Sequence, residues 1–231
     1  MSRTLAFSCA HAPVTRVGFP YFIQDIYEEW DCDGIICLGD LIDWTAISFH
    51  AAHPECPGPA DEYELAKVCV GRWYERFPDM TVTIGNHDER PGRKVEDAGV
   101  PSRFLRDYND IWNTPKWKWV DSTEVDNVTY LHGTGYSGKY HAANIRNDMH
   151  RSVVAGHIHS VGMIHYAQST RERIFGMNVG CGINDKMFNF AYSKHNMKRS
   201  FLGCGVVIDG VPYLEPMRCS RGEKYHDSKF E

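Results

Sequence analysis

The chain reads MTVTIGNHDE from Met80 to Glu89. The first half of this stretch, up to Ile84, is apolar and rich in β-branched residues, which predicts a buried strand. A glycine follows, and then come Asn86 and His87, two side chains that can bind a metal or move a proton. Open α/β sheets place their ligand sites at the carboxyl ends of strands. We therefore predict a functional site where this strand ends.

The composition narrows the class of protein. The chain has 231 residues, of which 42% are hydrophobic and 24% charged, and this fits one globular domain spanning residues 1–231. The formal net charge of −5 argues against a protein that binds nucleic acid through overall positive charge. No run of about 18 apolar residues occurs, so we expect no membrane span and no membrane partner.

The spacing of the cysteines and the first residues of the chain indicate in which cellular compartment the protein is expected. Eight cysteines are scattered along the chain without paired spacings such as CxxC. The residues after Met1 lead directly into a strand-like run and show no apolar signal-peptide segment. We expect reduced thiols and a cytoplasmic protein.

Short apolar runs alternate with helical patterns through the first two thirds of the chain. Strands are expected at 4–7, 34–38, 80–84, 128–131 and 152–155. Helices are expected at 21–30, 61–77, 101–112 and 140–149. The remainder is β-rich, with strands expected at 161–167, 173–179, 201–208 and 211–217. A charged loop at 89–100 and two irregular insertions near 44–60 and 183–200 interrupt this α/β pattern.

Five of the predicted strands are each followed by residue types that bind metals. These residues are Cys9 and His11, Asp40 and Asp43, Asn86 and His87, His132, and His157 and His159. Each alone has a simpler explanation, since a strand-end cysteine is usually a small buried hydrophobe and an aspartate a turn residue. Five sets at the same end of a parallel-type sheet instead predict a metal site. A carboxylate such as Asp40 could bridge two cations, and imidazoles would complete the shells without excess negative charge.

The motifs read CxH, GDxxD, GNHD, HG and GHxH, in this order, between residues 9 and 159. This order resembles the calcineurin-like metallophosphoesterases, whose first motif is normally DxH. The resemblance implies an α/β fold, a four-layer α/β/β/α sandwich of two mixed β-sheets flanked by helices. It also implies a metal-dependent hydrolase, a phosphatase or phosphodiesterase that cleaves phosphomonoesters or phosphodiesters at a dinuclear centre.

The resemblance implies a role for each motif residue. One metal would be held by Cys9, His11, Asp40 and His159, and the second by Asp40, Asn86, His132 and His157. His87 would act as general acid or charge stabiliser toward the leaving-group oxygen, and Asp43 would hydrogen-bond His87 and keep it oriented and cationic. The nucleophile would be a metal-bridging hydroxide that attacks phosphorus in line.

Cys9 departs from the family, which has aspartate at this position. Cys9 could be a thiolate ligand, which keeps the negative charge and favours zinc or iron over magnesium or manganese. It could instead mark a weak metal site, or a chain that has kept the fold and lost catalysis. The expected cofactors are two divalent or trivalent metal ions, manganese, zinc or iron, with zinc or iron favoured beside Cys9.

Substrate contacts are expected from the loops around the strand ends. The candidates are His50, Arg90 and Tyr136. Together with Arg93 and Lys94, Arg90 could hold a second phosphate or a nucleic-acid backbone, or could belong to an ordinary exposed charged loop. The loop of His50 could be a lid or a solvated insert, and the glycine-rich stretch around Tyr136 could be a structural turn.

Two other functions remain open from the sequence. A nuclease acting on DNA or RNA would use the same motifs, although the net charge does not favour it. A non-catalytic binding or scaffold protein on the same fold usually loses motif residues, whereas His87 is present here. The partner expected is a phosphate ester, with nucleotides among the candidates, and the oligomeric state stays open.

Overall fold

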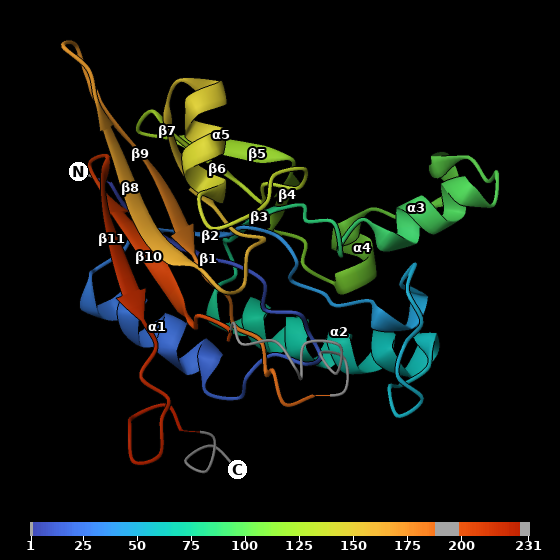
Figure 1. Cartoon of the computed structure of the whole chain (residues 1–231). Coiled ribbons are helices and arrows are strands. Elements are labelled where there is room, and N and C mark those ends of the chain that lie inside the picture. The colour runs from blue at the N-terminus through green and yellow to red at the C-terminus, as the bar shows by residue number, and fades with distance from the viewer. Residues whose placement is uncertain (1, 188–198, 227–231) are drawn as a thin grey trace.

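Two β-sheets with helices on their outer faces make up the computed structural model, which describes residues 2–187 and 199–226 (Figure 1). The first sheet has six strands, in the spatial order β11 (Val211–Pro216), β10 (Gly203–Ile208), β1 (Arg3–Phe7), β2 (Gly34–Cys37), β3 (Thr81–Thr83) and β4 (Lys118–Val120). The second has five, in the order β5 (Ser122–Val125), β6 (Val128–Leu131), β7 (Ser152–Ala155), β9 (Arg173–Val179) and β8 (Gly162–Gln168). Both sheets mix parallel and antiparallel pairs, which confirms the expected sandwich.

The helices cover the outer faces of the two sheets. α1 (Phe19–Glu29) and α2 (Pro59–Arg76) lie along the first sheet, and α5 (His141–Met149) lies on the second (Figure 1). Short helices fill the connections: η1 (Thr45–Ile47), α3 (Arg90–Asp97), η2 (Ser102–Phe104) and α4 (Tyr108–Trp112). Among the helices of the described residues, none combines the length and the apolar character needed to cross a bilayer.

Side chains of β1 alternate between two cores, one between the first sheet and its helices and one between the two sheets. Leu5 and Phe7 point to the helix side, where Phe7 stacks on Trp73 of α2 with ring centroids 4.7 Å apart. Ala6, between them, joins the core between the two sheets together with Tyr130 of β6. Successive side chains of a strand face opposite sides of the sheet. A strand that is buried on both faces therefore needs an apolar residue at every position.

The motif-bearing strands belong to two sheets rather than one. β1, β2 and β3 are parallel neighbours in the first sheet, and β6 and β7 are parallel neighbours in the second. The expected two sheets are present, but the expectation that all five motif-bearing strands end at the same edge of one sheet was wrong, because β5 and β6 form a hairpin that starts the second sheet. The polar residues that follow these strands therefore approach each other from two layers.

Residues 89–100, expected as a charged loop, contain a helix instead. α3 begins at Arg90, and Pro91 lies in its first turn, where a missing N–H removes no helical hydrogen bond. Region 101–112, expected as one helix, holds η2 and α4 with a break between them. The expected insertion near 44–60 contains η1, and residues 188–198 of the insertion near 183–200 lie outside the described residues.

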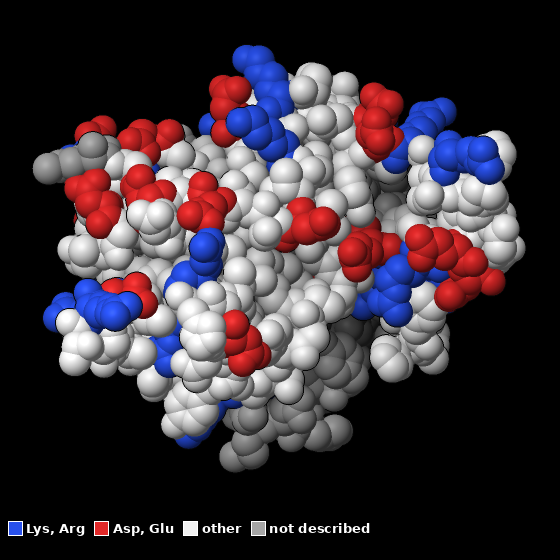
Figure 2. Space-filling view, turned by 90° about the horizontal axis from the view of Figure 1, so that it is seen from above, with Lys and Arg blue, Asp and Glu red and all other residues white. Residues whose placement is uncertain are grey.

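The surface charge is mixed. On the face seen in Figure 2, lysine and arginine side chains and aspartate and glutamate side chains are scattered among uncharged residues. This face has no continuous track of one sign, which agrees with the modest net charge of −5. Extended anionic partners are held by continuous basic tracks, and this face offers none.

Candidate metal centre

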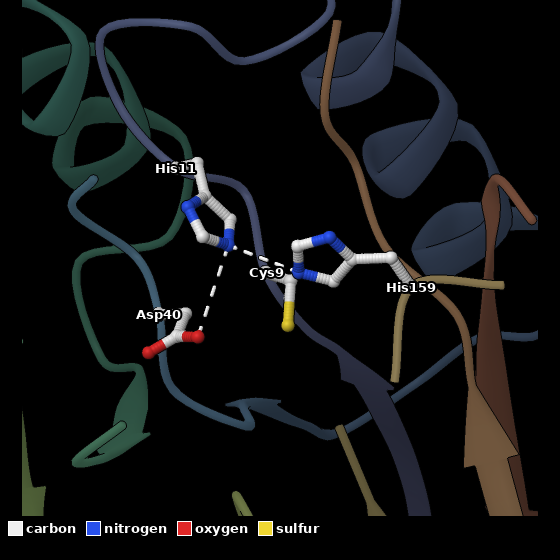
Figure 3. Close-up of side chains that lie close together, drawn as sticks. All are labelled: Cys9, His11, Asp40 and His159. Atoms are coloured by element: carbon white, nitrogen blue, oxygen red, sulfur yellow. Dashed lines mark hydrogen bonds and ion pairs between the residues drawn. The ribbon is translucent and has the colours of Figure 1, made fainter. Parts of the chain in front are cut away.

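One group of candidate metal ligands gathers around the end of β1. Its members are Cys9, His11, Asp40 and His159, whose ligand atoms lie within 4.8 Å of one another. His11 Nε2 is 3.1 Å from His159 Nε2 and 3.8 Å from Asp40 Oδ2. Figure 3 shows the Cys9 sulfur and the two imidazoles turned toward the space beside Asp40. We call this group the Cys9 side.

A second group gathers on the other side of the same carboxylate. His132 Nε2 is 3.1 Å from His157 Nδ1, 3.2 Å from Asn86 Oδ1 and 3.1 Å from Asp40 Oδ2. We call Asn86, His132 and His157 the Asn86 side. Asp40 Oδ2 therefore contacts one histidine of each side, His11 and His132.

Hydrogen bonds determine which ring nitrogens remain to bind a metal. His11 Nδ1 donates to Asp43 Oδ1 at 2.8 Å, and His132 Nδ1 donates to the carbonyl oxygen of Leu38 at 2.7 Å. Both partners can only accept, so each Nε2 presents a lone pair to the centre. Two ligands bound to one ion at about 2.0–2.2 Å lie about 3–3.5 Å apart. The spacings of 3.1–3.2 Å match this range, and the 3.8 Å between His11 Nε2 and Asp40 Oδ2 is slightly longer. These residues therefore fit two metal ions.

The backbone at the site is strained. Four of the candidate ligands have a positive φ although none is glycine: Cys9 (52°), His11 (50°), Asp40 (50°) and His157 (64°). This left-handed conformation costs roughly 1–2 kcal/mol per non-glycine residue. Such residues persist where the surrounding structure holds them, and they concentrate at functional sites.

Asp88 is one of the groups that hold these turns. Its Oδ2 accepts hydrogen bonds from the backbone N–H of Asp40 at 2.8 Å and of Gly85 at 2.9 Å, and its Oδ1 accepts from Ile42 at 3.1 Å. A Cβ at Gly85 would collide with Asp40, so the close approach of the two turns requires glycine. Asp88 thus joins the turn after β2 to the turn after β3.

The charges of the site are set by burial and by neighbouring histidines. Burial alone would raise the pKa of the Asp40 carboxyl, but His132, His87 and His11 outweigh it and hold that pKa well below its usual range. Burial, followed by the charge of Asp40, raises the pKa of the Cys9 thiol well above its usual value. Asp40 is therefore ionised at neutral pH, and a cation beside Cys9 is what would favour the thiolate.

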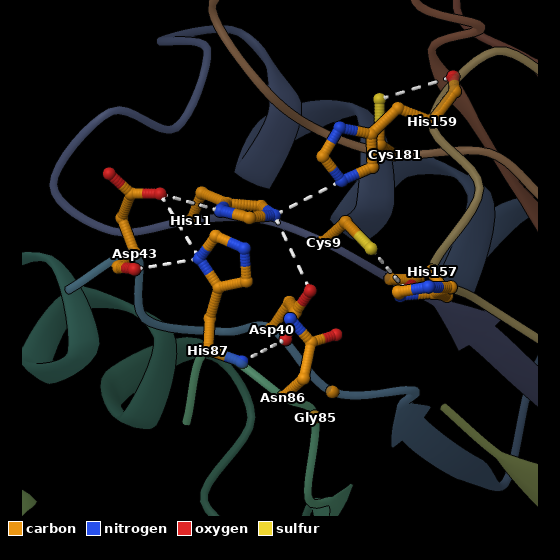
Figure 4. Close-up of polar contacts among 12 residues, drawn as sticks. Cys9, His11, Asp40, Asp43, Gly85, Asn86, His87, His157, His159 and Cys181 are labelled. Atoms are coloured by element: carbon orange, nitrogen blue, oxygen red, sulfur yellow. Dashed lines mark hydrogen bonds and ion pairs between the residues drawn. The ribbon is translucent and has the colours of Figure 1, made fainter. Parts of the chain in front are cut away.

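His87 lies next to both sides, in a hydrogen-bond network with Asp43 (Figure 4). Its Nδ1 donates to the backbone oxygen of Asp43 at 2.7 Å and lies 3.4 Å from the Asp43 carboxylate, whose shorter contact goes to His11. His11, Asp43 and His87 also form a possible metal group. We interpret it as a network, because both Nδ1 atoms point their protons at Asp43 oxygens.

The structure places the three predicted substrate contacts differently. Arg90 lies at the centre: its Nη2 is 3.0 Å from His87 Nε2. Tyr136 is turned to α5, where its hydroxyl donates to Asp148 at 3.0 Å. His50 is exposed after η1, and its side chain hydrogen-bonds to none of the residues that the structure describes.

Two supporting residues carry no sequence signal of their role. Ser8 Oγ lies 2.9 Å from Cys9 Sγ, and it follows β1 like any polar strand end. Glu62 is buried and accepts from the backbone N–H of Thr45 at 2.8 Å and of Ala46 at 2.7 Å, two and three residues after Asp43. An acidic residue in the first turn of a helix is common, so only the structure reveals that Glu62 braces this loop.

The comparison with protein families is decisive. The model of the calcineurin-like phosphoesterases matches residues 2–174. The chain belongs to this family. Calcineurin-like phosphoesterases are metal-dependent hydrolases of phosphate esters, and the two groups around Asp40 are possible metal-binding clusters of this phosphoesterase.

Solved structures similar to this phosphoesterase are distant in sequence. A metallophosphoesterase from Sphaerobacter thermophilus is 14% identical, with a TM-score of 0.48, 99% of this chain covered and 91% of the other. The phosphoesterase Yfce from E. coli is 12% identical, with a TM-score of 0.43 and coverages of 92% and 91%. Vps29 from Chaetomium thermophilum is 11% identical, with a TM-score of 0.43 and coverages of 97% and 93%. No curated protein matches the sequence.

Proposed function

We propose that this phosphoesterase hydrolyses phosphomonoesters or phosphodiesters with two metal ions, one on each side of Asp40. One observation carries the proposal. A single carboxylate oxygen, Asp40 Oδ2, lies 3.8 Å from His11 Nε2 and 3.1 Å from His132 Nε2, so two sets of ligands share it. Dinuclear hydrolases need such a bridge to keep two cations close together.

The two sides would hold different ions. On the Cys9 side, a thiolate, His11, His159 and Asp40 favour zinc or iron, because sulfur is a soft ligand. On the Asn86 side, an amide oxygen and two imidazoles accommodate manganese, zinc or iron. When bound, the two ions would supply the Lewis acidity that activates water and polarises the phosphoryl oxygens.

His87 would supply the proton that the leaving group needs. Its Nδ1 is held on the backbone oxygen of Asp43, so its Nε2 faces outward beside Arg90. In hydrolysis, the oxygen of water bonds to phosphorus and the water gives up a proton to solvent, while the ester P–O bond breaks. The leaving oxygen takes the Nε2 proton of protonated His87, which then regains a proton from solvent. Asp43 would position His87 through its backbone oxygen and His11 through its carboxylate.

An anaerobic screen of metals against p-nitrophenyl phosphate and bis-p-nitrophenyl phosphate tests the proposal. His87→Ala should lower kcat about 10²–10⁴-fold, the usual contribution of a general acid, with the metal content unchanged. His53→Ala, a change at an exposed histidine of the 44–60 segment, is the matched control. If the wild type turns over neither compound with any of the metals, the enzymatic function is wrong and a binding or scaffold role replaces it.

We also propose a reducing compartment such as the cytoplasm as the location. None of the eight cysteines, all of which lie in the described part of the chain, forms a disulfide there, and several of them are fully buried. Cys9 in particular would lose its ligand role on oxidation, since a thiolate ligand is the form that oxidants attack. Metal content after exposure to hydrogen peroxide, compared with an anaerobic sample, tests this dependence on reducing conditions.

A further inference from the structure

Arg90 occupies the approach to His87. Its Nη1 donates to the backbone oxygens of Asp43 at 2.8 Å and of Trp44 at 3.1 Å, and its Nη2 lies 3.0 Å from His87 Nε2. The two carbonyls hold the guanidinium in place, so its charge lies next to the ring atom that faces the leaving group. A guanidinium fixed in this way places a permanent positive charge, which attracts phosphate oxygens, beside His87.

Two more cations continue outward from Arg90 along α3. Arg93 and Lys94 stand three and four residues further on, which places all three on one face of the helix. Arg93 Cζ and Lys94 Nζ lie 4.7 Å and 3.9 Å from the ring centre of Phe49, on the segment that follows η1. Among the described residues, neither Arg93 nor Lys94 forms an ion pair. Both charges are therefore available to an anionic ligand.

The basic face of α3 is short. Beyond Lys94 the helix becomes acidic, with the exposed Glu96 and Asp97 at its end. With a rise of about 1.5 Å per residue, the three cations span roughly 6 Å of the helix. A long nucleic-acid strand needs a basic track over many phosphates, and the face in Figure 2 carries mixed charges. The length of the basic face fits one additional phosphate group.

We propose that Arg90, Arg93 and Lys94 bind a second phosphate, on the leaving-group side of the substrate, so that the enzyme prefers short polyphosphates such as nucleoside diphosphates. This proposal rests on the proposed function. In the reaction, the oxygen of water bonds to the terminal phosphorus and the bond from that phosphorus to the bridging oxygen breaks. The electron pair stays on the bridging oxygen, and the products are orthophosphate, a nucleoside monophosphate and one proton released to solvent.

Comparing ADP with AMP tests this preference, because the two differ by one phosphate. The double variant Arg93→Gln with Lys94→Gln should lower the ratio of kcat/KM for ADP to that for AMP about tenfold, the effect of losing charged contacts in a partly exposed site. The double variant Arg103→Gln with Arg106→Gln removes the same charge from exposed positions after α3 and should leave the ratio unchanged. Calorimetric titration with pyrophosphate should show the same loss of affinity relative to orthophosphate, and circular dichroism checks the fold of each variant.

Three results would overturn the proposal, and they differ in what else they affect. Suppose that AMP and p-nitrophenyl phosphate are hydrolysed, but that Arg93→Gln with Lys94→Gln has the same ADP-to-AMP ratio of kcat/KM as the wild type. The second phosphate site is then wrong, and the proposed function stands. If a single-stranded DNA 12-mer binds more tightly than pyrophosphate and Arg103→Gln with Arg106→Gln weakens it, the cations belong to a nucleic-acid track. If no phosphate ester is hydrolysed with any metal, the proposed function fails as well.

Discussion

The Cys9 side and the Asn86 side of the centre share Asp40 and contain two imidazoles each, yet they differ in their fourth residue and in their support. The Cys9 side carries a buried thiol next to Ser8, and its His11 is held by the Asp43 carboxylate. The Asn86 side carries a neutral amide, and its His132 is held by a backbone carbonyl. A carboxylate behind an imidazole makes it a stronger ligand than a carbonyl does.

If each side holds one ion, as proposed, this difference makes the two metal positions inequivalent. A thiolate adds a negative charge and a soft sulfur, whereas the amide of Asn86 adds neither. The side with the thiolate should bind its ion more tightly and select a softer metal. Substitutions of the shared Asp40, of a residue on one side only, or of a residue that supports the loops should therefore differ in their effects on metal content, activity and stability.

The largest effect is expected from Asp40→Asn, because it changes both sides at once. The amide removes the shared negative charge and places an NH₂ group where Asp40 Oδ2 lies between His11 and His132. We expect fewer than one metal ion per chain and a loss of activity of about 10³-fold or more. Elemental analysis and kinetics measure this, with Asp110→Asn at an exposed position of α4 as control. Two retained metals would show that Asp40 is no bridge.

Cys9→Ser should empty the Cys9 side alone. The serine hydroxyl stays neutral and hard, so we expect one metal per chain to be lost and one retained. Cys9→Asp, which restores the residue usual in the family, should keep two metals and shift the preference from zinc or iron toward manganese. Cobalt-loaded wild type should show a sulfur-to-cobalt charge-transfer band that both variants lack.

The control for the cysteine variants is Cys69→Ser, at a partly buried thiol of α2. All samples need anaerobic handling, because a ligating thiolate is open to oxidation. Unchanged metal occupancy in Cys9→Ser, together with a charge-transfer band that persists, would rule out thiolate ligation.

Asp88→Asn should weaken the turns that both sides depend on. Three backbone N–H groups donate to the two Asp88 oxygens, and an amide would turn an NH₂ group against at least one of them. We expect a loss of about 2 kcal/mol in the free energy of unfolding, the cost of a buried donor without an acceptor. Urea unfolding of the metal-free protein measures it, and both metal affinities should fall together. A stability equal to that of the wild type would contradict this role.

Glu62→Gln should have the smallest effect, restricted to the Cys9 side. One of the two N–H groups of Thr45 and Ala46 loses its acceptor, and the loop that carries Asp43 becomes looser. We expect about 1 kcal/mol of stability to be lost and a few-fold weaker metal binding on the Cys9 side only. Competitive titration with a chromogenic chelator resolves the two affinities. If metal binding weakens equally on both sides, the hydrogen bonds of Glu62 do not act specifically on Asp43 and His11.

The sequence predicted the strands that carry the site closely. The expected strand 4–7 is β1 (Arg3–Phe7), and the expected 152–155 is β7 (Ser152–Ala155), because apolar runs buried on both faces leave an unmistakable pattern. α3 was missed because Pro91 and Gly92 are loop signals in most contexts. A proline in the first helical turn is the exception, and only the packing of the following residues distinguishes the two cases.

The motifs predicted which residues are candidate ligands, but not the hydrogen-bond partners of the residues around them. That the Asp43 carboxylate lies nearer to His11 than to His87 depends on the backbone path between β1 and the residues after β2, which spacing along the chain does not encode. The same holds for the contact of Arg90 with His87 and for Tyr136, whose hydroxyl binds Asp148. Long-range side-chain pairs follow from tertiary packing, so local sequence could not predict them.

The left-handed backbone at Cys9, His11, Asp40 and His157 has a consequence for how this protein can change over evolutionary time. At roughly 1–2 kcal/mol per position, the strain is a sizeable fraction of the stability of an ordinary domain. Glycine at any of these positions would relieve the backbone and remove a candidate ligand. Selection for stability and selection for activity therefore act against each other at these four residues. Mutations that raise stability elsewhere in the fold are the ones that would let the site persist.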